Sequence, residues 1–234
     1  MRIYIEKNIW FVTAVLAAVA GYCDSVTFIY GNKIFSAHIT GNFIVFAFDA
    51  IKGADWKSWM KLLTFPVFIT SVVTAGWVAR KTNNWQILLL IEGILLSVSG
   101  LVDYTITKCG ILDFQWLYFG VMMIVFAMGF QNTFGKIFNR EILVPTTIMT
   151  GNVTQASLDA SSLLRSRTRN QATLTSLKKH LLAVGSFLCG CIAGAVIGKF
   201  VGLSAVAVPG LVLVTVFRNA VRSVSAVETE KYSV

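Results

Sequence analysis

Charged residues are scarce in this sequence. Asp, Glu, Lys and Arg make up 13% of its 234 residues, whereas hydrophobic types make up 56%. Soluble domains carry about a quarter of their residues as these four charged types. The chain therefore cannot cover a water-facing surface, and we predict a membrane protein.

Other shortages limit the chemistry that the chain can perform. The sequence has two histidines and four cysteines, and the cysteines lie in or beside apolar runs without metal-ligand spacing. It contains no P-loop, no G-x-S-x-G and no H-E-x-x-H motif. We therefore expect no metal, no cofactor, no disulfide framework, no ATP-driven pumping by this chain alone and no enzyme activity.

Long apolar runs are abundant. A helix needs about 20 apolar residues to cross a bilayer, and runs of helix length predict an all-α, polytopic bundle rather than a barrel. The N-terminal run resembles a secretory signal, but it continues to Tyr30, so we interpret it as the first span. Six stretches qualify or nearly qualify as spans: Ile9 to Tyr30, Leu62 to Ala79, Trp85 to Val102, Phe114 to Gly135, Leu181 to Gly198, and Val201 to Phe217.

Two stretches of the sequence repeat. Ala20-Gly21-Tyr22-Cys23-Asp24 is echoed 108 residues later by Met128-Gly129-Phe130-Gln131-Asn132. Ile39-Thr40-Gly41-Asn42 is echoed 110 residues later by Met149-Thr150-Gly151-Asn152, with Asp49 and Asp159 seven residues beyond each Asn. Further on, Gly76 before Arg80 matches Gly194 before Lys199. This predicts a single membrane domain over residues 1–234, with one repeat at about 9–105 and another at about 112–219.

The repeated residues resemble the YoaK-like family of bacterial multi-pass membrane proteins, filed as domain of unknown function 1275. The matching features are Gly21-Tyr22-Cys23-Asp24, His38-Ile39-Thr40-Gly41-Asn42, Gly129-Phe130-Gln131-Asn132 and Val144-Pro145-Thr146-Thr147-Ile148-Met149-Thr150-Gly151. Cys23 stands where the family pattern has a small apolar residue. The resemblance implies a protein of the bacterial plasma (inner) membrane, often suspected of transport, with no assigned substrate.

The two T-G-N elements, Ile34 to Ile51 and Val144 to Leu164, are too polar to face lipid along their length. A Gly at the centre loosens a helix, and Thr and Asn beside it can bind freed backbone groups or a ligand. Discontinuous helices of transporters have this character, which favours short broken or re-entrant helices at a solute site. Small and amide residues also pack helices closely, so a packing role stays open.

Positive charge predicts the orientation. The surplus of 20 Lys and Arg over 11 Asp and Glu lies between apolar runs, which indicates loops that flank spans rather than a nucleic-acid surface. Whether both T-G-N elements cross or neither does, 14 Lys and Arg face the cytoplasm and 6 face the other side. Both termini are therefore expected in the cytoplasm. The charge count does not decide between six spans and eight. We favour six, because three crossings in each half make an inverted repeat, whereas four would make a parallel one.

Asp24 lies deep in the first predicted span, where an acid costs about 2.5 to 3.5 kcal/mol on insertion scales. It should face a cavity or a partner, and His38 could pair with it and relay a proton. Its counterpart Asn132 is neutral, so the two halves differ here. The predicted solute site comprises Asp24, His38, Thr40, Gly41, Asn42, Gln131, Asn132, Thr150, Gly151 and Asn152.

Glycines recur at every fourth position near the end of the chain, at Gly190, Gly194, Gly198 and Gly202. A stripe of small residues lets a second helix approach closely. We favour packing within the bundle, with a homodimer as the alternative.

These features favour a secondary transporter or permease for a small solute, with its site between the repeats and proton coupling at Asp24. The expected partners are the lipid bilayer and an unidentified small molecule, and no nucleic acid. The alternative is a membrane protein with an assembly or structural role, whose T-G-N motifs are packing elements.

Overall fold

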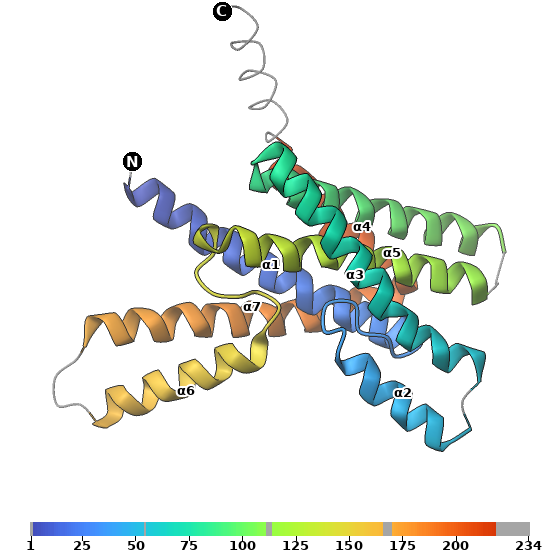
Figure 1. Ribbon diagram of the computed structural model, residues 1–234, viewed down its shortest axis with the longest axis horizontal. Helices are drawn as coiled ribbons and strands as arrows, with labels where there is room; N and C mark the ends of the chain where they lie inside the picture. The colour runs from blue at the N-terminus through green and yellow to red at the C-terminus, as the bar shows by residue number, and fades with distance from the viewer. Residues whose placement is uncertain (1, 54, 111–113, 166–169, 219–234) are drawn as a thin grey trace, which may run out of the picture.

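The computed structural model describes residues 2–53, 55–110, 114–165 and 170–218 (Figure 1). Over these ranges the chain is helical and contains no strand, which confirms the predicted all-α class. The elements are α1 (Arg2–Tyr30), α2 (Gly41–Ile51), α3 (Trp56–Thr82), α4 (Trp85–Lys108), α5 (Phe114–Ile137), the 3-10 turn η1 (Asn139–Glu141), α6 (Met149–Arg165), α7 (Gln171–Val201), the 3-10 turn η2 (Gly202–Val206) and α8 (Ala207–Phe217).

Within the described residues, five helical stretches are long and apolar enough to cross a membrane. Two of the predicted spans, Leu181 to Gly198 and Val201 to Phe217, fall within a single stretch that joins α7 to α8 through η2. Helix α7 ends at this point because Gly202 adopts a φ of +64°, a conformation that favours glycine. The five stretches are Ile9–Tyr30, Trp56–Thr82, Trp85–Lys108, Phe114–Ile137 and Gln171–Phe217.

The outer surface of the bundle is apolar. Trp77 is 76% exposed and Phe200 is 79% exposed, and they belong to different helices, α3 and α7. Large apolar side chains in such numbers on the surface of a monomer indicate a lipid or partner interface. Together with the five candidate spans, this surface supports the predicted membrane location.

Polar caps fix where two of the long helices begin. The side chain of Asp55 accepts a hydrogen bond from the N–H of Ser58 at 3.0 Å, at the start of α3. Asn170 accepts one from the N–H of Ala172, also at 3.0 Å, at the start of α7. A cap of this kind typically contributes about 1 kcal/mol.

Helices from opposite ends of the chain pack together. Helix α1 lies along α7 (Figure 1), and Gly190 and Gly194 of α7 face the backbones of Ala18 and Tyr22 of α1. Because the residue numbers of the contacts increase together, α1 and α7 run parallel. A Cβ at either glycine would overlap the backbone of α1, so this close approach depends on glycine.

Helices α3 and α5 form a second parallel pair. The rings of Trp56 and Tyr118 meet near the start of both helices, with centroids 5.4 Å apart. Farther along, the hydroxyl of Ser71 donates a hydrogen bond to the carbonyl oxygen of Phe126. The two parallel pairs therefore each join one helix from the first half of the chain to one from the second half.

Helix α4 runs antiparallel to α5. Trp85 at the start of α4 packs against Phe134 near the end of α5, with ring centroids 5.6 Å apart. Ser99, farther along α4, donates a hydrogen bond at 3.0 Å to the carbonyl oxygen of Gly120. Helix α4 also packs along α8 and η2, and so joins the last part of the described chain to the bundle.

Candidate functional site

Asp24 organises the segment between α1 and α2. Its Oδ1 accepts hydrogen bonds from the backbone N–H groups of Ser36 at 2.8 Å and Ala37 at 2.6 Å. Its Oδ2 lies 2.5 Å from Nδ1 of His38. Asp24 is only 4% exposed, so its carboxylate is buried among these partners. The hydrogen bond to Asp24 raises the pKa of His38 above its ordinary value, against the opposing effect of partial burial.

Asn132 of α5 holds the matching segment before α6. Its Oδ1 accepts a hydrogen bond from the hydroxyl of Thr147 at 2.8 Å. Next to it, Nε2 of Gln131 donates to the hydroxyl of Thr146 at 3.1 Å. Neutral side chains therefore fix the segment before α6, whereas the carboxylate of Asp24 fixes the segment before α2.

The asparagines of both T-G-N motifs bind the backbone of the segments that precede them. Nδ2 of Asn42 donates to the carbonyl oxygen of Phe35 at 2.8 Å, and Nδ2 of Asn152 donates to that of Pro145 at 2.7 Å. Gly41 is the first residue of α2, and Gly151 lies in the first turn of α6. A helix broken at its central glycine was expected in each element. Instead, each element consists of a non-helical segment followed by a short helix, α2 or α6, that begins at or near the glycine.

Side chains also tie α2 to α3. Nδ2 of Asn42 donates to the hydroxyl of Thr64 at 3.0 Å. One turn away, Nζ of Lys61 lies 2.8 Å from Oδ2 of Asp49, although Lys61 is only 2% exposed. A buried Lys requires a partner of this kind. The first T-G-N element is therefore fixed to the helix that follows it.

The same arrangement ties α6 to α7. Oδ1 of Asn152 lies 3.1 Å from Nδ1 of His180. Within α6, Nε2 of Gln155 donates to Oδ1 of Asp159 at 2.9 Å, and Asp159 is 7% exposed. Several polar residues of the second T-G-N element therefore form hydrogen bonds within the fold.

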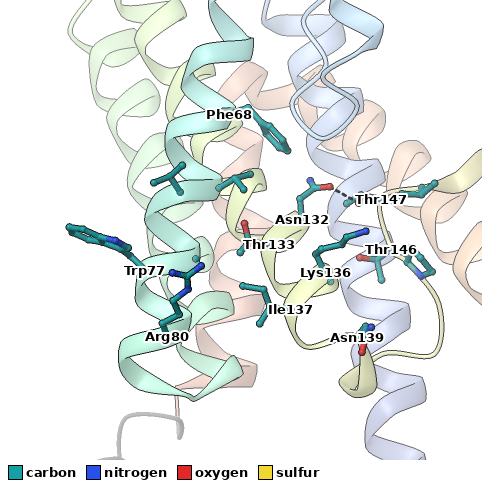
Figure 2. A pocket seen from close by; sticks show the side chains of 16 residues that line it. Phe68, Trp77, Arg80, Asn132, Thr133, Lys136, Ile137, Asn139, Thr146 and Thr147 are labelled. Carbon is teal, nitrogen blue, oxygen red and sulfur yellow. Dashed lines mark hydrogen bonds between the residues drawn. The ribbon is translucent and has the colours of Figure 1, made fainter.

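A cavity of about 790 Å³ lies between α3, α5 and the segment that precedes α6. Figure 2 shows Arg80 of α3 and Lys136 of α5 on facing sides of it. Its lining residues are Phe68, Val72, Val73, Gly76, Trp77, Arg80, Asn132, Thr133, Gly135, Lys136, Ile137, Asn139, Pro145, Thr146, Thr147 and Ile148.

Of the ten residues predicted to bind solute, Asn132 lines this cavity and the other nine do not. Thr40, Thr150 and Gly151 are exposed at the starts of α2 and α6. Arg80 and Lys136 were weighed from the sequence only as charges that set orientation. No sequence signal separates them from other cations at helix ends, because only the packing of α3 beside α5 brings them to one cavity.

Glycine allows close packing in both parallel helix pairs. A Cβ at Gly194 of α7 would come within 2.6 Å of the carbonyl oxygen of Tyr22, and a Cβ at Gly129 of α5 would overlap the side chain of Ser71 in α3. Gly76 of α3 stands four residues before Arg80, whereas Gly194 stands five residues before Lys199, so the two glycines do not occupy equivalent positions. A Cβ at Gly76 would meet nothing within 4 Å, because Gly76 lines the cavity beside the α3–α5 crossing.

Glu92 is a further buried acid, in α4. It is 0% exposed, and neither side-chain oxygen has a hydrogen-bond partner within the described part of the chain. It does not line the cavity. Elsewhere in the described residues, no group of three or more His, Cys, Asp or Glu side chains could hold a metal ion.

Comparison with known proteins identifies a family for this bundle. No curated protein and no solved structure matches the chain. The family model described as protein of unknown function (DUF1275) matches residues 12–218, which extend from α1 to the end of α8. The chain therefore belongs to the DUF1275 family.

Proposed function

We propose that this protein is a secondary transporter or permease for a small solute, and that the cavity between α3 and α5 is its solute site. The observation that carries the proposal is the cavity itself, which a side chain at Gly76 of α3 would enter without meeting a neighbour within 4 Å. Sites for small molecules span roughly 300–1,000 Å³, and this cavity, at about 790 Å³, falls within that range.

Matching hydrogen bonds support an internal repeat. Asn42 and Asn152 stand 110 residues apart, and so do their acceptors Phe35 and Pro145. Each asparagine thus binds the carbonyl seven residues before it. Two segments that make the same bond at the same spacing are expected of two copies of one structural unit.

A second pair of contacts supports the same proposal. The bond from the N–H of Ala37 to Asp24 is matched by the bond from Thr147 to Asn132. The helix residues are 108 apart and the segment residues are 110 apart. In both halves, a polar side chain of the first long helix therefore holds the segment that leads into the short helix.

The directions of α1 and α5 support an inverted repeat. Nε2 of Gln131, near the end of α5, donates to the carbonyl oxygen of Leu16 in α1 at 2.9 Å. Asn32, just after α1, donates to the hydroxyl of Tyr118 near the start of α5 at 2.5 Å. The two helices run antiparallel, so copies that begin with them have opposite orientations. This favours three full spans in each half and six in all.

Contacts around Tyr118 support a re-entrant first T-G-N element. Asn32 follows α1 and Trp56 begins α3, and both contact Tyr118. The chain therefore leaves α1 and enters α3 at the same level, and α2 need not cross. With both termini in the cytoplasm, the ends of α3 and α5 face the cytoplasm, and so does the mouth of the cavity.

An inverted repeat provides a mechanism for transport. Its two halves can exchange conformations, which moves access from one side of the membrane to the other. In the observed conformation Ser36, Ala37 and His38 hold the carboxylate of Asp24, so proton coupling there would require the exchange of conformations to open these hydrogen bonds. The freed carboxylate could then take up a proton, which would couple transport to protons.

The proposal can be tested by filling the cavity. Gly76→Phe places a ring in its open space, and Gly185→Phe is the matched control, since a Cβ at Gly185 of α7 also meets nothing within 4 Å and lies outside the cavity. We would screen metabolite mixtures for compounds that raise the unfolding midpoint of the protein in nanodiscs. A ligand at a hundred times its Kd stabilises by about 2.7 kcal/mol.

The expected result is that stabilising compounds act on the wild type and on Gly185→Phe but not on Gly76→Phe. The same compounds should enter proteoliposomes that contain the wild type or Gly185→Phe. Equal stabilisation of Gly76→Phe would remove the cavity from the proposal. Binding without uptake would contradict transport.

The structural alternative has its own supporting observation. Asn42 and Asn152 are buried and bind the backbone of their own elements rather than facing the cavity. Thr40 and Thr150 are exposed. If the T-G-N motifs act in packing alone, Thr40→Val and Thr150→Val will leave solute binding and uptake unchanged, whereas a loss of binding with unchanged stability would assign them to the site.

A further inference from the structure

We propose that the ligand of the cavity is a small organic carboxylate with an apolar body. This inference rests on the proposed function and names the class of solute for that site. It is carried by three observations on the lining: the sign of its charges, the state of its hydrogen-bonding groups and the nature of its wall.

The charges that line the cavity are of one sign. Arg80 comes from α3 and Lys136 from α5, and the lining contains no Asp or Glu (Figure 2). Neither cation has an ion-pair or hydrogen-bond partner within the described part of the chain, in contrast to Lys61, which pairs with Asp49. Two unpaired cations at one cavity attract an anion.

Most neutral polar side chains of the cavity are already engaged. The hydroxyl of Thr147 donates to Asn132 at 2.8 Å, and that of Thr133 donates to the carbonyl oxygen of Gly129 at 2.8 Å. The hydroxyl of Thr146 accepts from Gln131. The free donors of the lining include the amide of Asn139, the guanidinium of Arg80 and the ammonium of Lys136, and the two charged groups among them favour a carboxylate over a polyol such as a sugar.

The wall of the cavity is apolar. Phe68, Val72, Val73 and Trp77 line it from α3, and Ile137 lines it from α5. Apolar surface of this extent is covered favourably by a ring or hydrocarbon chain. The ligand should therefore combine an anionic head, held by Arg80 and Lys136, with an apolar body against α3.

Two neighbouring cations provide a control for this assignment. Lys81 follows Arg80 at the end of α3, and Arg140 lies four residues after Lys136. Neither lines the cavity. The double variant Lys81→Gln, Arg140→Gln thus removes the same charge from the same end of the bundle as Arg80→Gln, Lys136→Gln, without changing the lining.

The test uses three probes on the full chain in phosphatidylcholine nanodiscs, with calorimetric titration. Phenylacetate carries both the anion and the ring, phenylacetamide is its neutral analogue, and acetate lacks the ring. We expect phenylacetate to bind at least about tenfold more tightly than either analogue, since charge-assisted bonds to two cations are lost in one and the apolar contact in the other. Arg80→Gln, Lys136→Gln should weaken phenylacetate binding at least about tenfold, and Lys81→Gln, Arg140→Gln should not.

Four outcomes would overturn the inference. Absence of phenylacetate binding would do so, as would equal loss of affinity in both double variants. Equal binding of phenylacetamide, still abolished by Gly76→Phe, would reject the carboxylate while leaving the cavity as a solute site. A lipid source is distinguished by discs that contain phosphatidylglycerol: stabilisation by that lipid, lost in Arg80→Gln, Lys136→Gln and not in the control, would assign the cavity to a lipid headgroup instead.

Discussion

Asp24 links the last turns of α1 to the segment that leads into α2. Its two carboxylate oxygens are shared among backbone N–H groups and the ring of His38. Several hydrogen bonds to one carboxylate offset part of the cost of burying it at this depth. The residue therefore acts first as a connector in the observed conformation, and any proton chemistry requires that these bonds open.

His38 should make stability depend on pH. Its pKa in the folded protein is raised by Asp24, so its contribution is fully present below the unfolded-state value, about 6.5, and is lost as the pH rises through the folded-state pKa. We expect the unfolding midpoint of the wild type to exceed that of His38→Gln by several degrees at pH 6, equivalent to about 1 kcal/mol, and the difference to shrink by pH 9. Thermal unfolding across this range measures it.

His180→Gln is the control for this experiment, because His180 is the other histidine of the chain. It should not reproduce the pH-dependent part of the difference. A difference in unfolding midpoint between the wild type and His38→Gln that stays constant from pH 6 to pH 9 would contradict the role of the His38–Asp24 pair.

The sequence was informative at Asp24 because an acid inside an apolar run is rare and demands a partner. The pairing with His38 could be proposed from their proximity along the chain. The cavity residues Arg80 and Lys136 could not be found in this way, because cations at helix ends also occur wherever a loop faces the cytoplasm. Only the packing of α3 beside α5 distinguishes them from Lys81 and Arg140.

At the scale of helices, glycine allows the backbones of α1 and α7 to approach closely. Gly190 and Gly194 face the backbone of α1, whereas Gly202 has no neighbour that a Cβ would meet within 4 Å and instead ends α7 with a positive φ. Four evenly spaced glycines thus serve two purposes. Their spacing alone could not separate the positions in contact with another helix from the position that terminates one.

Substitution of Gly194 and substitution of Gly76 should have different consequences. Gly194→Ala places a Cβ against the carbonyl oxygen of Tyr22 and should destabilise the protein by about 1–3 kcal/mol, the usual range for overpacking. Gly76→Ala enters open space and should be neutral or stabilise slightly, since Ala favours helix by up to about 1 kcal/mol over Gly. Unfolding midpoints in nanodiscs compare the two variants.

A loss of stability in Gly76→Ala as large as that in Gly194→Ala would show that no open space lies beside Gly76 in the membrane. It would thereby contradict the cavity on which the transport proposal depends.

At the scale of the whole molecule, the all-α class and the positions of most long helices could be predicted from apolar runs, because each run reports its own burial in lipid. The pairing of α1 with α7 and of α3 with α5 could not, since no local pattern specifies a partner more than a hundred residues away. The sequence predicts a break between Gly198 and Val201, and the structure places it slightly later, with α7 ending at Val201 and α8 beginning at Ala207.

The re-entrant course proposed for the first T-G-N element predicts a labelling pattern. Lys33 lies just after α1 and Lys52 just after α2, and both are exposed. In a variant with its native cysteines replaced by Ala, Lys33→Cys and Lys52→Cys should both react with an impermeant maleimide from outside the cell. Lys81→Cys and Lys136→Cys should react only after the cytoplasmic face is opened. Labelling of Lys33→Cys and Lys52→Cys from opposite sides would instead require α2 to cross the membrane.

The pairing of α1 with α7 has a consequence for biogenesis. Helix α1 leaves the ribosome first, but α7 begins only at Gln171, so the early helix waits in the bilayer through most of translation. During that interval Asp24 does not lack hydrogen-bond partners, because Ser36, Ala37 and His38 follow it closely in the chain and can bind its carboxylate. The bundle can therefore be inserted in chain order, and α7 docks parallel to an α1 whose acid is already hydrogen-bonded.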